Sequence, residues 1–364
     1  MKRVRVVVIG TSWWADAMYL PALATLAEAE LVAVLGRDPK KARDLANKWC
    51  IKNWYTNAEA MYQDLDFEAC IVATDNESHF DLTMQAIKNG KHVLCEKPLG
   101  VDVEQAHRMM TYSEQQGLTT MVPFTYRHMP FICYMKDLLA RSYCGEIYHF
   151  NMRYYASYGR SSSYSWRFDQ MKGGGGVLAD LGSHFVHLAR YLVGDIGSVF
   201  CQLGVKQSRV HPEGHSYQQE NDVAIMNLKF KNHALGSIHV SCMAKEDTTF
   251  GQIHSLEIHG SQGTLHGFCD YDQTQEVKGS QINGEATQIM EIPSSYFAWM
   301  RTDSVHNTYK DIFRKTEVMA RAFIVALANK REHKEADFRE GWEVRRVLAA
   351  ARKSALEQRM IAVT

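Results

Sequence analysis

The chain has 364 residues, more than one small core requires, and this length favours two domains. Its 41 basic and 41 acidic residues cancel, which excludes a broad charged surface for nucleic acid or anionic membranes. A hydrophobic content of 46% excludes a mainly disordered chain, and no apolar run reaches the ~20 residues that cross a bilayer.

Strand and helix patterns alternate along residues 1–125 and predict an α/β domain of the Rossmann dinucleotide-binding type. Such alternation implies a parallel sheet covered by helices on both faces. Runs rich in β-branched residues predict strands over Val4–Ile9, Leu31–Leu35, Ala69–Ala73, His92–Cys95 and Thr119–Val122. Helical patterns lie between them over Lys40–Trp49, Ser78–Asn89 and Val103–Gln115.

The alternation of strands and helices ends in residues 126–364, for which we expect a second, α+β domain. Strands without helices between them usually pair antiparallel, so the pattern predicts an open, mainly antiparallel sheet. The expected strands are Ile147–Tyr155, Val199–Val205, Val223–Phe230, Leu235–Ser241, Ser255–His259 and Thr264–Gly267. The expected helices are Leu178–Val193, Tyr309–Lys330 and Arg339–Glu357.

The eight cysteines are widely spaced and form no Cys-x-x-Cys motif. Several lie inside apolar runs, which is typical of reduced core thiols rather than of disulfides or zinc ligands. The start of the chain superficially resembles a signal peptide, but Arg5 interrupts its apolar stretch. We therefore expect a cytoplasmic protein.

A tight turn follows the first predicted strand at Gly10, Thr11, Ser12, Trp13 and Trp14. It occupies the place of a Gly-x-Gly-x-x-Gly fingerprint in which only the first glycine remains. The residues that replace the other two glycines are small, so the backbone can still approach a pyrophosphate. The start of a helix at this point favours an anion. A tight turn that binds no ligand is the alternative.

The second predicted strand ends at Gly36, Arg37 and Asp38. An NAD site favours an acidic residue where Gly36 stands, whereas Arg37 can pair with a 2′-phosphate through its planar fork. Asp38, followed by a proline, is better explained as a helix cap. The pattern slightly favours NADP over NAD, although Arg37 can also be an ordinary solvated loop residue.

Two further groups carry acid–base chemistry. Lys97 follows a buried strand, whose carboxyl end would border a ligand crevice. Asp180, His184 and His187 follow one another at i, i+4 and i+7 on a predicted helix. His184 can exchange a proton near neutral pH, and Asp180 can orient it or its substrate. A surface lysine and core-packed histidines are the alternatives. No fourth donor completes a zinc set, so we expect no metal.

Taken together, the motifs resemble those of the Gfo/Idh/MocA family of oxidoreductases. The resemblance extends over essentially the whole chain. It is carried by the Gly10 turn and by residues 73–79, 90–98, 126–130, 166–167, 174–184 and 258–264.

The resemblance implies that Lys97, Asp180 and His184 are catalytic and transfer hydride and proton between NAD or NADP and a sugar, polyol or cyclitol. It implies that Tyr126 and Trp166 contact substrate, and that the protein is a homodimer or homotetramer. The implied cofactor-binding residues are Gly10, Thr11, Ser12, Trp13, Trp14, Arg37, Thr74, Asn76, His79, Glu96, Lys97 and Arg127.

Two other functions remain compatible with the resemblance. One is a glycosidase that holds NAD tightly and oxidises its substrate only transiently. The other is a non-catalytic, sugar-sensing regulator. Because a binding protein needs no proton relay, the presence of Lys97, Asp180 and His184 together argues against the regulator.

Overall fold

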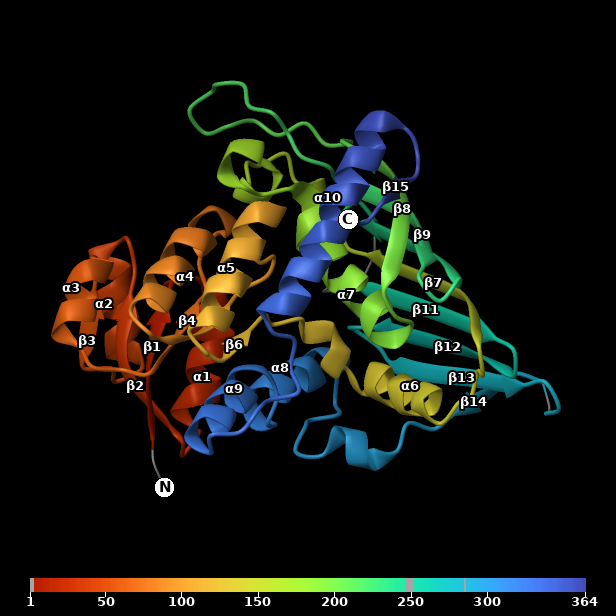
Figure 1. Ribbon diagram of the computed structural model, residues 1–364, viewed down its shortest axis with the longest axis horizontal. Helices are drawn as coiled ribbons and strands as arrows, with labels where there is room; N and C mark the ends of the chain where they lie inside the picture. Colours follow the sequence, from red (N-terminus) through yellow and green to blue (C-terminus); the bar gives the residue numbers. More distant parts are fainter. Residues whose placement is uncertain (1–2, 246–251, 285) are drawn as a thin grey trace. The chain divides into compact units, whose positions relative to one another are not determined.

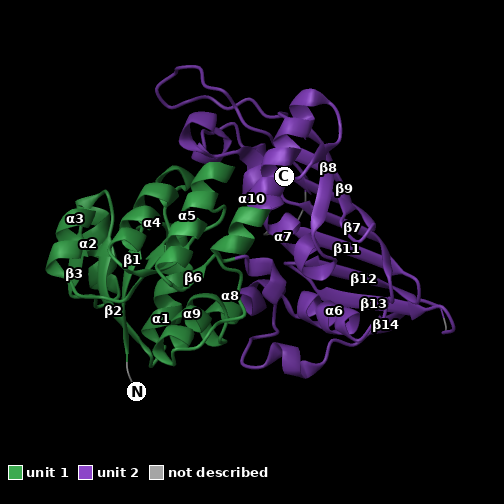
Figure 2. Ribbon diagram, in the orientation of Figure 1, with its two compact units in different colours: residues 1–123, 310–343 green, residues 124–309, 344–364 purple. Residues whose placement is uncertain are grey.

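The computed structural model describes residues 3–245, 252–284 and 286–364. The chain forms two compact units (Figure 2). Unit 1 comprises residues 1–123 and 310–343, and unit 2 comprises residues 124–309 and 344–364. The sequence patterns place a single boundary at residue 125, whereas residues 310–343 return to unit 1. In the described part of the chain, no helix is both long and apolar enough to cross a membrane.

A six-stranded parallel sheet forms the centre of unit 1 (Figure 1). Its strand order is β3-β2-β1-β4-β5-β6, which is the doubly wound order of a Rossmann sheet and confirms the expected fold class. The strands are β1 (Val4–Ile9), β2 (Ala29–Leu35), β3 (Asn53–Tyr55), β4 (Ala69–Val72), β5 (His92–Cys95) and β6 (Thr120–Met121).

Helices connect these strands. They are α1 (Leu20–Ala24), α2 (Pro39–Lys48), α3 (Ala58–Asp64), α4 (His79–Lys88) and α5 (Val103–Gln115), and a π-helical turn η1 (Ala15–Tyr19) leads into α1. Asp38 is the expected cap of α2, because its carboxylate accepts from the N–H groups of Lys40 and Lys41 at 2.9 and 3.1 Å. This cap sets where α2 begins.

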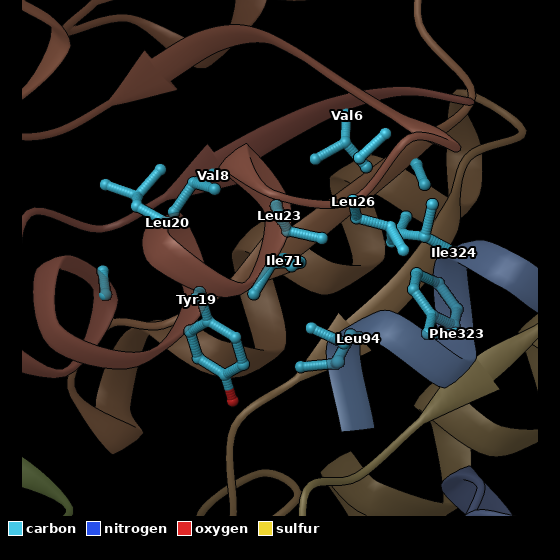
Figure 3. Close-up of a cluster of buried hydrophobic side chains, with 14 of the residues drawn as sticks. Val6, Val8, Tyr19, Leu20, Leu23, Leu26, Ile71, Leu94, Phe323 and Ile324 are labelled. Carbon is cyan, nitrogen blue, oxygen red and sulfur yellow. The ribbon is translucent and has the colours of Figure 1, made fainter. Parts of the chain in front are cut away.

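The C-terminal segment contributes to unit 1 as well. Instead of one helix over Tyr309–Lys330, the chain forms α8 (Val305–Lys315) and α9 (Met319–Ala328). Met319 has a φ of 53°, a left-handed conformation that interrupts helical geometry. Phe323 and Ile324 of α9 are fully buried and join Val6, Val8 and Leu94 of the sheet in one hydrophobic cluster (Figure 3). Burial of this apolar surface explains why the segment returns to unit 1.

A nine-stranded sheet forms the centre of unit 2, in the order β14-β13-β12-β11-β7-β10-β9-β8-β15. The expectation of a mainly antiparallel sheet is confirmed, with one exception: β7 and β10 pair in parallel. The strands are β7 (Ile147–Tyr155), β8 (Ile196–Gly204), β9 (Val223–Phe230), β10 (Leu235–Ser241), β11 (Ile253–Gly260), β12 (Gly263–Asp270), β13 (Gln275–Gln281), β14 (Gln288–Met290) and β15 (Ile361–Ala362).

Helices cover one face of this sheet. They are α6 (Pro130–Ala140), the π-helical turn η7 (Leu178–Gly182) with its continuation α7 (Ser183–Leu192), and α10 (Phe338–Glu357), which begins in unit 1. Along β10, Ile238 and Val240 are buried while Leu235 is exposed, so the second face of the sheet stays open. Short 3₁₀ segments are Asn76–Ser78, Thr125–His128, Tyr158–Arg160, Trp166–Phe168, Gln170–Lys172 and Ser294–Phe297.

Candidate active site

The turn after β1 in unit 1 depends on Gly10. This residue has a φ of 126°, and a Cβ there would lie 2.3 Å from the carbonyl oxygen of Ala73, so only glycine fits. Ser12 Oγ donates to the same carbonyl at 3.1 Å and accepts from the Ala15 N–H at 3.3 Å. Trp13 beside it is 68% exposed. The turn thus brings bare backbone and the start of a helix to the carboxyl end of β1, as a dinucleotide pyrophosphate requires.

At the end of β2, Gly36 packs closely against Thr11 and Arg37 is exposed. A Cβ on Gly36 would lie 2.5 Å from the side chain of Thr11, so any larger residue there would require Thr11 to shift. Arg37 Nη2 lies 2.7 Å from an oxygen of Asp75 in the loop after β4, and its side chain is 89% exposed. Arg37 is therefore available at the surface, but it already has a carboxylate partner.

His79, at the start of α4, is fully buried. Its ring nitrogens lie 3.2 Å from the Pro98 carbonyl and 3.3 Å from the Thr74 carbonyl. Burial lowers its pKa, and the two carbonyls partly oppose that effect. The ring therefore ties the loop after β4 to the loop after β5. Thr74 lies half-buried in the first of these loops, and Asn76 beside it is buried.

Glu96 and Lys97 follow β5 but differ in their surroundings. Glu96 is buried, and its carboxylate accepts from the Tyr19 hydroxyl and, at 3.1 Å, from the Lys97 N–H. Desolvation raises the pKa of Glu96, and the charge of Lys97 opposes this effect. Lys97 itself is half-buried. Glu96 thus fixes the end of β5 to η1, and Lys97 carries the cation of this loop.

In unit 2, η7 and α7 carry the expected Asp–His stripe. Leu181, Phe185, Leu188 and Leu192 are buried, which confirms the apolar stripe of this helix. Asp180 is half-buried, and its Oδ2 accepts from the Tyr158 hydroxyl at 2.8 Å and lies 3.6 Å from Arg167 Nε. A hydroxyl and a guanidinium thus converge on one carboxylate oxygen.

His184 and His187 are buried beside aromatic rings. The ring centroid of His184 lies 4.6 Å from that of Tyr126, and the His187 ring stacks on Phe124 at 4.3 Å. Tyr126 is itself buried and also contacts Tyr154 and His254. The aromatic neighbours hold the imidazole of His184 in a defined orientation.

Two other expected residues lie elsewhere in unit 2. Trp166 is half-buried, and the Arg167 guanidinium lies over its ring at 4.7 Å. Since Arg167 also approaches Asp180, the structure groups Trp166 with the Asp180 carboxylate. Arg127 lies instead over the ring of Tyr191 at 4.3 Å.

The sequence patterns did not find the Asp180 partners. Tyr158 belongs to none of the sequence patterns described above, and Arg167 belongs only to the motif at residues 166–167. Tyr19, the partner of Glu96, carried no sequence signal at all. Each of these contacts joins residues far apart along the chain, so no local spacing rule identifies it.

A doubly wound domain with this glycine turn defines a dinucleotide-binding protein, and the second, open-sheet domain carries an aspartate–histidine helix. Residues 4–124 match the family model described as an oxidoreductase family with an NAD-binding Rossmann fold. Residues 132–266 match the model of the GFO/IDH/MocA C-terminal domain. The chain belongs to the Gfo/Idh/MocA family of oxidoreductases. It is an oxidoreductase with an NAD-binding Rossmann domain.

Characterised relatives are similar over most of the chain. Levoglucosan dehydrogenase from Pseudarthrobacter phenanthrenivorans is 27% identical over 73% of this chain and 70% of its own. The 1,5-anhydro-D-fructose reductase of Ensifer adhaerens is 26% identical over 65% of this chain and 68% of its own. A solved levoglucosan dehydrogenase in complex with NADH has the same fold, with a TM-score of 0.87 and 21% identity over the full length of both chains.

Proposed function

We propose that the protein transfers a hydride between a nicotinamide cofactor and a hydroxyl or carbonyl group of a sugar, polyol or cyclitol. Relatives named for anhydrosugars and sugar phosphates support this substrate class. The single observation that carries the proposal is the aspartate–histidine helix. It presents Asp180, held by a tyrosine and an arginine, one turn before the buried imidazole of His184.

In the oxidative direction, His184 accepts the proton of the substrate hydroxyl. A bound nicotinamide would supply the acceptor for the hydride that leaves the carbon bearing this hydroxyl. The aromatic neighbours of His184 restrict its ring, which favours proton transfer between His184 and the substrate oxygen in one geometry. Asp180 orients this hydroxyl and stabilises the imidazolium that forms. In reduction, the same proton returns from His184 to the new alkoxide.

Lys97 stabilises the negative charge that develops on the substrate oxygen. Its ammonium group provides three donors on a flexible stem, which suits a hydroxylated ligand. Glu96 and His79 act as positioning residues, because their side chains hold the two loops that flank Lys97. The direct cofactor contact that the family resemblance implies for both residues stays a prediction beside this role.

The expected cofactor-binding residues form groups that would hold different parts of the dinucleotide. Gly10, Thr11, Ser12, Trp13 and Trp14 would hold the pyrophosphate, and Thr74 and Asn76 would bind the nicotinamide half. Arg37 favours NADP, because an exposed ion pair with Asp75 contributes little and can be exchanged for a 2′-phosphate. Arg127, Tyr126 and Trp166 remain proposed contacts for nicotinamide and substrate.

The open face of the nine-stranded sheet supports a homodimer or homotetramer, since Leu235 and Phe268 of its strands are exposed. Free thiols support a cytoplasmic location. Among the residues that the structure describes, the eight cysteines form no disulfide, and six of them are buried.

One experiment tests the proposed activity. Purified protein is titrated with NADPH and NADH by fluorescence, and sugars, cyclitols and their keto forms are then screened for net nicotinamide turnover. We expect saturable cofactor binding and turnover with at least one such compound. Glycoside cleavage without net reduction would instead indicate the redox-cycling glycosidase, and binding without any turnover would indicate the regulator.

A further inference from the structure

A second cluster of ligand-type side chains lies outside the proposed active site, in the loop between β8 and β9. His211, Glu213 and His215 each direct one donor atom to a common point, and these atoms all lie within 4.8 Å of one another. The two imidazole rings lie with their centroids 3.7 Å apart. We propose that this His-x-Glu-x-His loop binds a divalent transition metal of the zinc class.

The donor set selects the kind of ion. Two imidazole nitrogens and one carboxylate oxygen suit Zn²⁺, Co²⁺, Ni²⁺ or Cu²⁺, whereas Mg²⁺ and Ca²⁺ prefer oxygen ligands alone. Glu213 and His215 are exposed and His211 is half-buried, so a solvent molecule can supply the fourth ligand. The site is therefore a three-residue site that is open to water.

The local backbone brings the three side chains together. The Gly214 N–H donates to the His211 carbonyl at 2.8 Å and closes a tight turn, in which Gly214 has a φ of 76°. His211 Nδ1 accepts from the Glu213 N–H at 3.2 Å. Metal binding releases this bond, because a neutral imidazole has only one lone pair. The cost is the loss of one long hydrogen bond.

Without an ion, the cluster has little to hold it. His215 Nδ1 lies 3.6 Å from Glu213 Oε2, a pair that is ionic only when His215 is protonated. A bound cation would give the three donors a common partner, because it takes one lone pair from each imidazole and one from the carboxylate.

The loop is fixed at its base, so that an ion would order its tip. Arg209 and Asp222 form an ion pair of 2.6 Å whose side chains are almost completely buried. At the tip, the ring of Tyr164 lies 4.6 Å from that of His211, and its hydroxyl donates to Asp169 at 2.9 Å. A metal on His211 would thus stabilise the packing between this loop and the segment that carries Trp166 and Arg167.

The test uses the full-length protein without a histidine tag, stripped with EDTA and dialysed. Zn²⁺ is titrated calorimetrically, and Co²⁺ is titrated by its visible absorption. We expect one site per chain. His211→Ala and His215→Ala should each weaken binding at least ~10-fold, and Glu213→Gln should also weaken it. His233→Asn is the control: it removes an exposed histidine, and asparagine tolerates its φ of 70°.

A further readout separates this site from unspecific binding. Hydrogen exchange in residues 205–222 should slow when Zn²⁺ is added to the wild type, but not to His215→Ala. The proposal is overturned if the wild type binds neither ion at millimolar concentration, or if the loop variants bind as tightly as wild type and His233→Asn.

Discussion

The Tyr158 hydroxyl donates a hydrogen bond of 2.8 Å to the carboxylate of Asp180. The ring of Tyr158 is partly exposed, but desolvation and the charge of Asp180 raise the pKa of its hydroxyl well above the ordinary value. Tyr158 therefore stays neutral and remains a donor over the whole range in which a dehydrogenase works. Because the bond favours the ionised carboxylate, Tyr158 is a positioning residue for Asp180.

Removing this donor should change the pH profile as well as the rate. Tyr158→Phe loses a hydrogen bond to a charged group, worth about 1.5–3 kcal/mol, so we expect kcat to fall roughly 10- to 100-fold. The acidic limb of the kcat profile should move to higher pH, because Asp180 loses a bond that favours its charged form. Steady-state kinetics across pH measure both effects.

The control is Tyr112→Phe, which changes a tyrosine of similar exposure in unit 1. It should leave the rate and profile unchanged. A fall in kcat for Tyr158→Phe with an unmoved acidic limb would mean that Tyr158 does not act through Asp180.

Arg37 and Asp75 should set the cofactor preference in opposite directions. Arg37→Ala should weaken NADPH more than NADH, because only NADPH carries a 2′-phosphate. Asp75→Asn should tighten NADPH, since it frees Arg37 of a competing carboxylate. The amide can still accept from Ser78, so the turn after β4 is preserved. Fluorescence titration measures the dissociation constants of both cofactors for wild type and each variant, and equal effects of Arg37→Ala on both cofactors would remove the case for NADP.

His254 in β11 should make the protein sensitive to acid. It is fully buried, burial lowers its pKa to about 3, and among the described residues neither ring nitrogen has a hydrogen-bond partner. Its folded-state pKa lies below the unfolded value of about 6.5. The stability that depends on neutral His254 is thus complete above that pH and is lost as the pH falls.

Between pH 7 and pH 5 this loss amounts to about 2 kcal/mol of unfolding free energy. Leucine binds no proton. Over the same interval, the unfolding free energy of His254→Leu should therefore fall by about 2 kcal/mol less than that of wild type. Urea unfolding at the two pH values measures the difference, with the exposed His233→Asn as control. An identical decline in His254→Leu and wild type would show that His254 is not the group responsible.

The local sequence predicts most of the secondary structure because burial leaves a clear pattern. The apolar run Val4–Ile9 can only be a strand between two helical layers, and Asp38 followed by Pro39 marks the start of α2. Strand direction is a tertiary property, so the parallel pairing of β7 with β10 escaped prediction. The break before α9 escaped as well, because Met319 gives no sign of a left-handed conformation.

The candidate site was predictable where its residues share one helix or one turn. Asp180 and His184 follow helical spacing, and Gly10 occupies a recognisable fingerprint position. Contacts between distant segments, such as Tyr19 with Glu96, depend on packing that no spacing encodes. The loop cluster at His211, Glu213 and His215 was missed for another reason: alternate positions in a polar loop converge only when a turn brings them together.

We propose that Lys97 and His184 stabilise charge and transfer the proton, and that neither side chain supplies most of the affinity for the cofactor. Two controls accompany the variants. Lys97→Arg keeps the charge, and His187→Gln changes the neighbouring buried histidine of the same helix. The double variant shows whether the two groups act on one step, since coupled residues lose less together than the sum of their separate losses.

The most direct measurement is the turnover rate of Lys97→Ala and His184→Ala, each at saturating cofactor whose dissociation constant is determined on the same sample. We expect both variants to bind the cofactor within a few-fold of wild type and to lose at least ~100-fold in rate, the scale of an acid–base group. Near-normal turnover in both variants, or a loss explained entirely by weaker cofactor binding, would show that Lys97 and His184 do not stabilise charge and transfer the proton.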